Sequence, residues 1–316
     1  MSRDGAHDSF FAALIGDGRP LLIVLALVLI GCGLFAGFQA ATGQFLPHDT
    51  AYLGMTAQQL CALHGCRIVH FMIHDRISFG GVLVAIGTMY LWLVLFPLRA
   101  GEAWAWWTFA ASGTVGFLSF LTWLGYGYLD TWHGLSTLAL LPLYIWGLAR
   151  TRRLLPPTSG WRSLLIPGEP MNVGRLCLLL TTLGIIGGGL TIMTVGMTQV
   201  FVPQDLEYMR VDVAAIRAIS GRLVPLIAHD RAGFGGGLAS CGVAMFLAVW
   251  CGRLTRSLLQ ALAVAGAAGF ITAIGVHPAI GYINLTHLGP AVFGALVFTF
   301  GLVLASRRAH AHHATQ

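Results

Sequence analysis

Lysine is absent from this sequence, and charged residues of any kind are scarce. All 18 basic residues among the 316 are arginines, and charged residues make up 9% of the chain. Soluble domains carry about 25% charged residues, so the composition excludes an ordinary soluble domain. The net charge of +6 comes from arginines between apolar segments and not from a basic patch, so we expect no nucleic-acid partner.

Long apolar runs take up most of the chain instead. Hydrophobic residues make up 56% of the sequence, and the mean hydropathy is +0.77. A helix needs about 20 apolar residues to cross about 30 Å of hydrocarbon. At this hydrophobicity we expect the spans to be helices, because every backbone N–H and C=O in the bilayer must be hydrogen-bonded within the protein. The sequence predicts an all-α polytopic membrane protein with transmembrane helices near 20–43, 74–97, 103–125, 131–149, 175–199, 229–251, 257–279 and 284–306.

The arginines indicate the direction of crossing, because basic residues are enriched on the cytoplasmic side. They gather between the fourth and fifth predicted spans and in the C-terminal tail, at Arg150, Arg152, Arg153, Arg162, Arg175, Arg307 and Arg308. Eight spans would put both groups on one side. We therefore expect a multi-pass protein of the plasma (bacterial inner) membrane with both termini in the cytoplasm.

One sequence pattern occurs twice. HDRISFGG at 74–81 matches HDRAGFGG at 229–236, FLPHD at 45–49 matches FVPQD at 201–205, and GYLDTWH at 127–133 matches GYINLTH at 281–287. Each half holds an even number of predicted spans, which indicates a parallel repeat of two four-helix bundles. The predicted divisions are a cytoplasmic N-terminal segment, a first repeat, a cytoplasmic linker, a second repeat and a cytoplasmic tail, at 1–19, 20–149, 150–174, 175–306 and 307–316.

Histidine occupies only two positions in both halves. These are His74 with its counterpart His229, and His133 with its counterpart His287. The other histidines between the first span and the tail have no counterpart and rank behind these, namely His48, His64, His70 and His277. Ionisable residues inside membrane helices are candidates for function.

Two imidazoles on facing helices of one bundle can bind a heme from both axial sides. Each half would then use its own two histidines, so we expect one or two bis-histidine heme b groups. The neighbouring acidic and amide residues could orient the imidazoles by accepting a ring N–H, and these are Asp75, Asp130, Asp230 and Asn284.

The arginine of each repeated motif, Arg76 and Arg231, would then bind a heme propionate. The alternative is that each His-Asp-Arg marks a helix N-terminus, with Asp favoured by the macrodipole and Arg extending to lipid headgroups. The glycines that follow each motif would serve either a flat porphyrin or close helix packing.

The six cysteines fall into two groups. Four lie within or at the ends of predicted spans, where a buried thiol behaves as a small hydrophobe. Cys61 and Cys66 lie in the first predicted outer loop, where a disulfide persists. A metal site that uses His64 between them is the alternative.

The arrangement of spans and repeated histidines resembles the heme A synthase family. The spacing within each half is similar to that family's, with 59 residues from His74 to His133 and 58 from His229 to His287. The cysteine pair and the stretch GFITAIGVHPAIGYINLTHLGP are similar as well. The resemblance covers about residues 20–306. It implies His74/His133 and His229/His287 as axial pairs in an oxidoreductase acting at the outer leaflet.

The chain also departs from that family's pattern. Heme A synthases have a glutamate three residues before the first histidine, where this chain has Phe71 and Leu226, and Asp75 or Asp230 stands before the arginine. That glutamate serves the oxidation chemistry, so the resemblance favours heme binding more than that reaction.

Other functions fit the same residues. A membrane hydrolase or hydroxylase could hold Zn or Fe with His74, Asp75, Asp130 and His133, or with the equivalent residues of the second half. Parallel repeats also occur in transporters, and a purely structural subunit is the remaining alternative. The expected partners are membrane lipid and, for a redox protein, a quinone or another redox partner.

Overall fold

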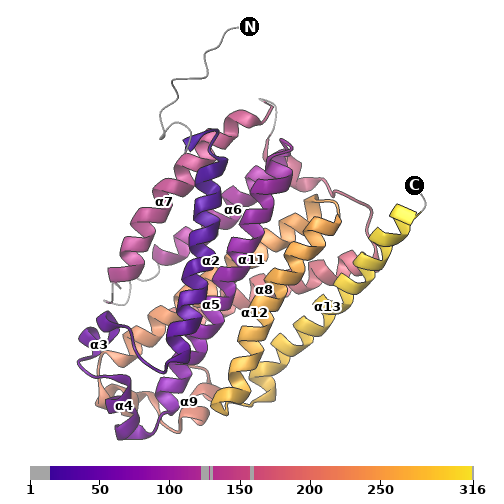
Figure 1. Cartoon of the computed structure of the whole chain (residues 1–316). Coiled ribbons are helices and arrows are strands. Elements are labelled where there is room, and N and C mark those ends of the chain that lie inside the picture. Colours follow the sequence, from indigo (N-terminus) through magenta and orange to yellow (C-terminus); the bar gives the residue numbers. More distant parts are fainter. Residues whose placement is uncertain (1–14, 122–127, 129–130, 157–159, 315–316) are drawn as a thin grey trace.

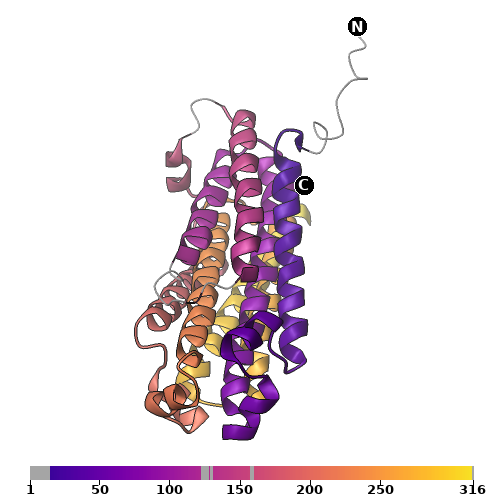
Figure 2. The ribbon, with the colours of Figure 1, turned by 90° about the vertical axis from the view of Figure 1, so that its left-hand side faces the viewer.

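The computed structural model describes the whole chain except residues 1–14, 122–127, 129–130, 157–159 and 315–316. Every regular element among the described residues is helical. Eight long helices form the body of the molecule: α2 (Arg19–Ala41), α5 (Arg67–Leu93), α6 (Ala103–Ser119), α7 (Thr131–Thr151), α8 (Val173–Met197), α11 (Leu223–Cys251), α12 (Arg256–Ile280) and α13 (Leu285–Ala314). They run side by side along the long axis (Figure 2).

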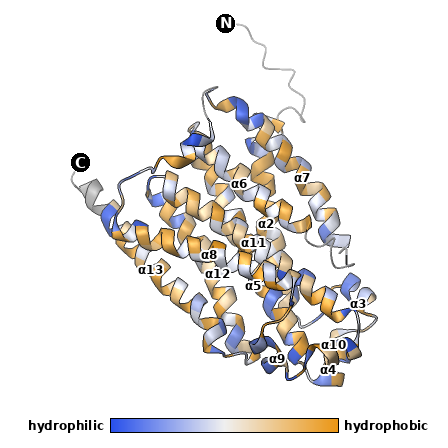
Figure 3. Cartoon of the chain, turned by 180° about the vertical axis from the view of Figure 1, so that it is seen from behind, coloured by the Kyte–Doolittle hydropathy of each residue, from blue (hydrophilic) through white to orange (hydrophobic). Residues whose placement is uncertain are grey.

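Six of these helices are long and apolar enough to cross a membrane, namely α2, α5, α8, α11, α12 and α13. α5 is continued by a π-helical turn, η1 (Val94–Leu98), which contains Pro97. The remaining two are not among these candidates: α6 has only 17 residues, and α7, with 21 residues, is less apolar. Apolar residues cover the middle of the long helices, and polar residues gather toward their ends (Figure 3).

Short helices and turns connect the long helices at the two ends. α3 (Pro47–Leu53), α4 (Ala57–His64), α9 (Pro203–Met209) and α10 (Val213–Ile219) lie at the end opposite to the start of α2 and the end of α13 (Figures 1 and 3). The turns η3 (Arg152–Leu154) and η4 (Trp161–Leu165) belong to the connection between α7 and α8.

α5 and α11 form the centre of the bundle and contact each other. α2 and α12 pack against α5, whereas α8 and α6 pack against α11. α7 then lies against α2 and α6, and α13 lies against α8 and α12. The sequence predicted bundles of four consecutive helices, but in the structure α6 and α12 each pack mainly on the central helix of the other half.

The glycines of the repeated motifs allow α12 to pack closely on α5 and α6 to pack closely on α11. A Cβ atom at Gly81 of α5 would collide with Thr272 on α12, and one at Gly236 of α11 would collide with Ser119 on α6. Gly80 and Gly235 make equally close approaches to the backbones of α2 and α8. These glycines therefore serve close helix packing, which was one of the two roles that the sequence left open.

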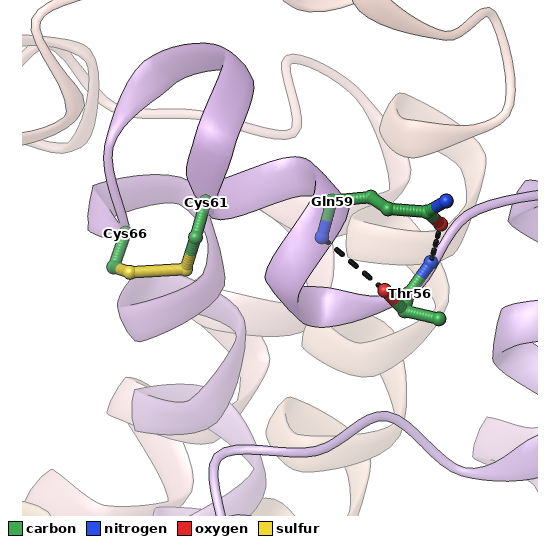
Figure 4. The surroundings of a disulfide bond; sticks show 4 residues. All are labelled: Thr56, Gln59, Cys61 and Cys66. Atoms are coloured by element: carbon green, nitrogen blue, oxygen red, sulfur yellow. Dashed lines mark hydrogen bonds between the residues drawn. A yellow bond between two sulfur atoms is a disulfide. The ribbon is translucent and has the colours of Figure 1, made fainter.

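The predicted cysteine pair joins α4 to the start of α5. Cys61 and Cys66 form a disulfide with a Cα–Cα distance of 4.2 Å (Figure 4). α4 itself begins with a capping box, in which Thr56 Oγ1 accepts from the Gln59 backbone N–H and Gln59 Oε1 accepts from the Thr56 backbone N–H. The capping box stabilises the start of α4, and the disulfide attaches the short helix to the start of α5.

Candidate metal centre and charged network

The repeated Asp-Arg pairs bind each other across the bundle. Together with two acidic residues from α3 and α9 they make a buried cluster, called the Arg–Asp network, of Asp49, Asp75, Arg76, Asp205, Asp230 and Arg231. Arg76 contacts Asp230 Oδ2 at 2.9 Å and Asp49 Oδ2 at 2.7 Å. Arg231 contacts Asp75 Oδ2 at 3.3 Å and Asp205 Oδ2 at 2.7 Å. Each arginine thus connects the central helix of the other half to a short helix of its own half.

The repeated tyrosines complete this network in the same way on both sides. The Tyr128 hydroxyl donates to Asp49 Oδ1 at 2.8 Å, and the Tyr282 hydroxyl donates to Asp205 Oδ1 at 2.7 Å. Burial, and then the negative charge of Asp205, raise the pKa of Tyr282. Its hydroxyl therefore stays protonated and remains a donor to the carboxylate.

A second reciprocal contact lies nearer the surface. The Arg67 guanidinium donates to the Tyr208 carbonyl at 2.8 Å, and the Arg222 guanidinium donates to the Tyr52 carbonyl at 2.6 Å. Each guanidinium also lies over the ring of the same tyrosine, at 5.8 Å and 5.5 Å from the ring centroid. The short helices of each half are thereby attached to the central helix of the other half.

The alternative of a helix N-terminus at His-Asp-Arg is wrong. α5 begins at Arg67 and α11 at Leu223, so both motifs lie about two turns inside their helices. The helices start earlier than expected because residues such as Phe71 and Leu226 are fully buried between the short helices and continue the apolar face. The predicted starts of the second and sixth spans, at 74 and 229, are therefore too late.

Three histidines meet beside one side of the network. They are His74 on α5, His277 near the end of α12 and His287 in the first turn of α13, called here the histidine triad. One candidate ligand atom from each lies within 4.8 Å of the others. The ring centroids are 4.5 Å, 5.2 Å and 5.6 Å apart. His74 and His277 are buried, and His287 is half-buried.

Each imidazole of the triad has an oxygen atom near its Nδ1 atom. His277 Nδ1 lies 2.7 Å from the Ala273 carbonyl, which can only accept, so Nδ1 carries the proton and Nε2 carries the lone pair. His277 Nε2 is buried and has no hydrogen-bond partner among the described residues. His74 Nδ1 lies 3.1 Å from Asp75 Oδ1, an ion-pair contact without hydrogen-bond alignment, and His287 Nδ1 lies 4.0 Å from Asp205 Oδ1. Oxygen acceptors at Nδ1 typically orient metal-binding histidines.

The sequence ranked His277 behind the repeated histidines because it has no counterpart in the other half. Its position explains why it joins them. α12 ends one turn after His277, Gly281 turns the chain with φ 72°, and α13 returns past His287. A histidine on each side of one tight helix–helix turn was the signal available in the sequence.

The other two repeated histidines form the histidine pair, His133 and His229. His133 Nδ1 and His229 Nε2 are 2.9 Å apart, and the Tyr128 ring lies 5.0 Å from the His229 ring. The sequence predicted axial pairs within each half, His74 with His133 and His229 with His287. The contacts in the structure run between the halves instead. Because α6 packs on α11 and α12 packs on α5, the helices that follow them start beside the opposite central helix.

The remaining predicted residues have different roles. Asn284 Oδ1 accepts from the backbone N–H groups of Thr286 and His287 at 3.0 Å and 3.1 Å, so it caps α13 and does not orient an imidazole. Asp75 does face His74, as predicted, but it also binds Arg231. Arg76 and Arg231 are both occupied by carboxylates, so neither is placed to bind a propionate. Asp130 lies outside the described residues.

The charges of the Arg–Asp network do not balance. Four carboxylates, those of Asp49, Asp75, Asp205 and Asp230, face only two guanidinium groups within it. Buried charge without compensation is costly. Asp75 and Asp205 are the two carboxylates that reach the histidine triad, so a cation held by the triad would lie next to the excess negative charge.

Comparison of the chain with models of protein families, with characterised proteins and with solved structures finds no match.

Proposed function

We propose that this chain is an integral membrane metalloenzyme in which the histidine triad binds one divalent transition-metal ion. The observation that carries the proposal is the geometry of the triad. Three imidazoles converge, each has an oxygen atom near Nδ1, and the Nε2 atom of His277 is buried without a partner. Buried polar atoms in proteins nearly always have partners.

The distances suit a metal ion of the size of zinc. Two nitrogens bound tetrahedrally at about 2.0–2.1 Å lie about 3.3 Å apart, and the candidate ligand atoms of the triad are within 4.8 Å of one another. Metal binding therefore requires the rings to move closer together. Zn is the ion that three imidazoles suit best, and Fe is the second choice.

The excess negative charge beside the triad supports the same proposal. Asp75 and Asp205 each lie between Arg231 and one histidine. In this position they add negative charge close to a divalent cation held by the triad. Tyr282 stacks on His287 with ring centroids 4.6 Å apart and donates to Asp205, so it positions both.

The reaction class follows from the number of protein ligands. An ion with three histidine ligands keeps a fourth position for water and lowers the pKa of that water to about 7. This chemistry is that of a metal-assisted hydrolase. The three histidines would hold the ion as neutral imidazoles, and the Tyr282 hydroxyl would stay protonated beside them.

A bis-histidine heme remains the second candidate, on the resemblance to heme A synthases. Its supporting observation is that His133, which contacts His229, lines a partly open cavity between α2, α5, α6, α7 and α11. Two axial imidazoles on one iron need their nitrogens about 4 Å apart, twice a metal–imidazole bond of about 2 Å. In the histidine pair the nitrogens are 2.9 Å apart, so heme binding requires this pair to open.

We also propose that α6 and α7 cross the membrane, which gives eight spans in two repeats. The equivalent contacts of the two halves support this, since α2 and α12 flank α5 as α8 and α6 flank α11. The disulfide lies at the end with α3 and α4, and the arginine-rich connection η3 lies after α7. These features favour a plasma membrane with the disulfide outside and both termini in the cytoplasm.

Metal analysis of the detergent-purified protein tests the proposal. We expect about one zinc or iron per chain and loss of that metal in His74→Ala, His277→Ala and His287→Ala. His133→Ala is the matched control, because it removes a repeated histidine outside the triad, and it should keep the metal. Equal metal content in all four variants would contradict the triad as the site. A Soret band that disappears in His133→Ala would favour heme instead.

A further inference from the structure

Ser78 is a buried serine of α5 that lies one helical turn after His74. It is 1% exposed, and its Oγ atom has no hydrogen-bond partner among the residues that the structure describes. Several other hydroxyls inside helices of this chain donate to the carbonyl four residues earlier, as Thr88 does to Val84 at 2.8 Å. Few buried polar atoms in proteins lack a partner, so the Ser78 hydroxyl needs an explanation that its own helix does not supply.

Ser78 lies on the face of α5 that packs against α12. His74, four residues before it, contacts His277 of α12, with ring centroids 4.5 Å apart. Gly81, three residues after it, is in close contact with Thr272 of α12. Residues at these spacings share one face of a helix, so Ser78 lies between the two contacts. Its Cα–Cβ bond is tilted toward the start of α5, which is the direction of His74.

The imidazole of His277 extends into the same region from α12. The two helices are antiparallel, since Gly81, which follows Ser78 on α5, contacts Thr272, which precedes His277 on α12. His277 Nδ1 lies 2.7 Å from the Ala273 carbonyl, so the ring folds back along α12 toward the level of Ser78. Its Nε2 atom is buried and, like the serine hydroxyl, has no partner among the described residues. Two such polar atoms therefore face the space between the same two helices.

Aromatic rings cover the triad at the end of the bundle that carries the short helices. The Tyr282 ring lies 4.6–5.9 Å from all three imidazoles, measured between ring centroids. Tyr282 in turn stacks on Tyr208 at 4.4 Å. Tyr282 belongs to the turn between α12 and α13, whereas Ser78 lies farther into the bundle. The serine hydroxyl is thus on the side of the triad that these rings do not cover.

Comparison of the two halves connects this hydroxyl with the triad. The fifth residue of the first motif, HDRISFGG, is Ser78, and the fifth residue of the second motif, HDRAGFGG, is Gly233. Both central helices take part in the Arg–Asp network in the same way, so that framework does not require a hydroxyl at this position. The hydroxyl is present in the motif that supplies a histidine to the triad.

We propose that the Ser78 hydroxyl binds the water molecule at the fourth position of the triad metal, so that this position faces the interior of the bundle between α5 and α12. This role rests on the proposed function, because it requires the metal. A metal–oxygen bond of about 2.0–2.2 Å and a hydrogen bond of about 2.7–2.8 Å together span about 5 Å. Side chains one turn apart on a helix are about 5–6 Å apart. A serine hydroxyl can accept a hydrogen bond from the bound water and donate one to the hydroxide formed from it.

A pH titration of the cobalt-loaded, detergent-purified protein tests this role, because the visible absorption of Co²⁺ changes when its bound water loses a proton. In Ser78→Ala the hydroxide loses a donor, so the midpoint of the change should rise by about one pH unit or more. Ser78→Thr keeps the hydroxyl and should keep the midpoint of the parent protein. Ser240→Ala is the matched control. It removes a buried hydroxyl that donates to the Ser112 carbonyl at 2.8 Å, from a helix that contributes no residue to the triad, and it should not move the midpoint.

Cobalt content measured on the same samples separates this role from the proposed function. All three variants keep the triad and should bind about one cobalt per chain. An unchanged midpoint in Ser78→Ala at full cobalt content would overturn the role of Ser78 and leave the triad as the metal site. An equal rise in Ser78→Thr or in Ser240→Ala would assign the shift to packing and would overturn the role as well. A parent protein that binds neither cobalt nor zinc would overturn both proposals.

Discussion

The histidine triad and the histidine pair stand at equivalent places in the two halves, yet they differ in chemistry. Each includes one histidine from a central helix and one from the helix that starts beside it, His74 with His287 and His229 with His133. Among the residues that the structure describes, only the first has a further histidine, His277, and only there do three imidazoles converge. In the second, two imidazoles bond each other beside an apolar cavity.

This difference shows how a repeated framework supports two kinds of site. The Arg–Asp network and the two tyrosines are the same on both sides and hold the central helices together. The distinction comes from one added side chain at the end of α12.

The largest effect is expected from the shared network. Arg231→Met leaves Asp75 and Asp205 buried without their cation, and Arg76→Met does the same to Asp49 and Asp230. Breaking a buried ion pair from one side costs about 3–5 kcal/mol, so both variants should lower the free energy of unfolding by similar amounts. Thermal unfolding in detergent measures this. A large loss for one arginine and none for the other would show that the network is not shared equally.

Metal affinity should separate the triad from the pair. Asp75→Asn weakens the acceptor beside His74, and such outer-shell changes reduce metal affinity about 10- to 100-fold. Asp230→Asn changes the equivalent residue after His229, which is outside the triad, and should leave the zinc affinity unchanged. Competition with a fluorescent zinc chelator measures both. Equal weakening would indicate that the two sites are not distinct.

The glycines after each motif should show equal sensitivity in the two halves. Gly81→Val and Gly236→Val put side chains into contacts that have no room, with Thr272 and Ser119 respectively. Overpacking costs about 1–3 kcal/mol, measured as lowered melting temperature. Gly134→Ala is the control, since its Cβ would have no neighbour within 4 Å. If Gly81→Val were harmless, α12 would not pack on α5 as closely as described.

The tyrosines test the comparison through one hydrogen bond in each half. Tyr128→Phe and Tyr282→Phe each remove one hydrogen bond to a buried carboxylate. A hydrogen bond to a charged acceptor contributes about 1.5–3 kcal/mol to the free energy of unfolding, so each variant should lose no more than this. Tyr282→Phe should also reduce zinc affinity, because Tyr282 contacts His287 and Asp205. Tyr128→Phe should not. Chemical unfolding and zinc competition on the same preparations distinguish the two effects.

Much of this arrangement was predictable from the sequence, but the partners of the helices were not. The eight helices lie close to the predicted spans, and Cys61 pairs with Cys66. The repeat also singled out four of the five histidines in the two sites. A nearly uniform apolar helix has no polar face to show which side is buried, so the packing of α6 on α11 and of α12 on α5 left no periodic signal.

The same limitation explains His277. The histidines were ranked by repetition, and repetition favours what the halves share, whereas the triad depends on a residue that they do not share. The pairing of Asp75 with Arg231 and of Asp230 with Arg76 was likewise hidden, because each pair spans more than 150 positions and depends on the contact between α5 and α11.

Zinc-edge X-ray absorption of the purified, zinc-loaded protein tests the central claim most directly. We expect three imidazole nitrogens at about 2.0–2.1 Å with one further light atom, and loss of one imidazole or of the metal in His277→Leu. Sulfur ligands at about 2.3 Å, or a spectrum that His277→Leu leaves unchanged, would contradict it.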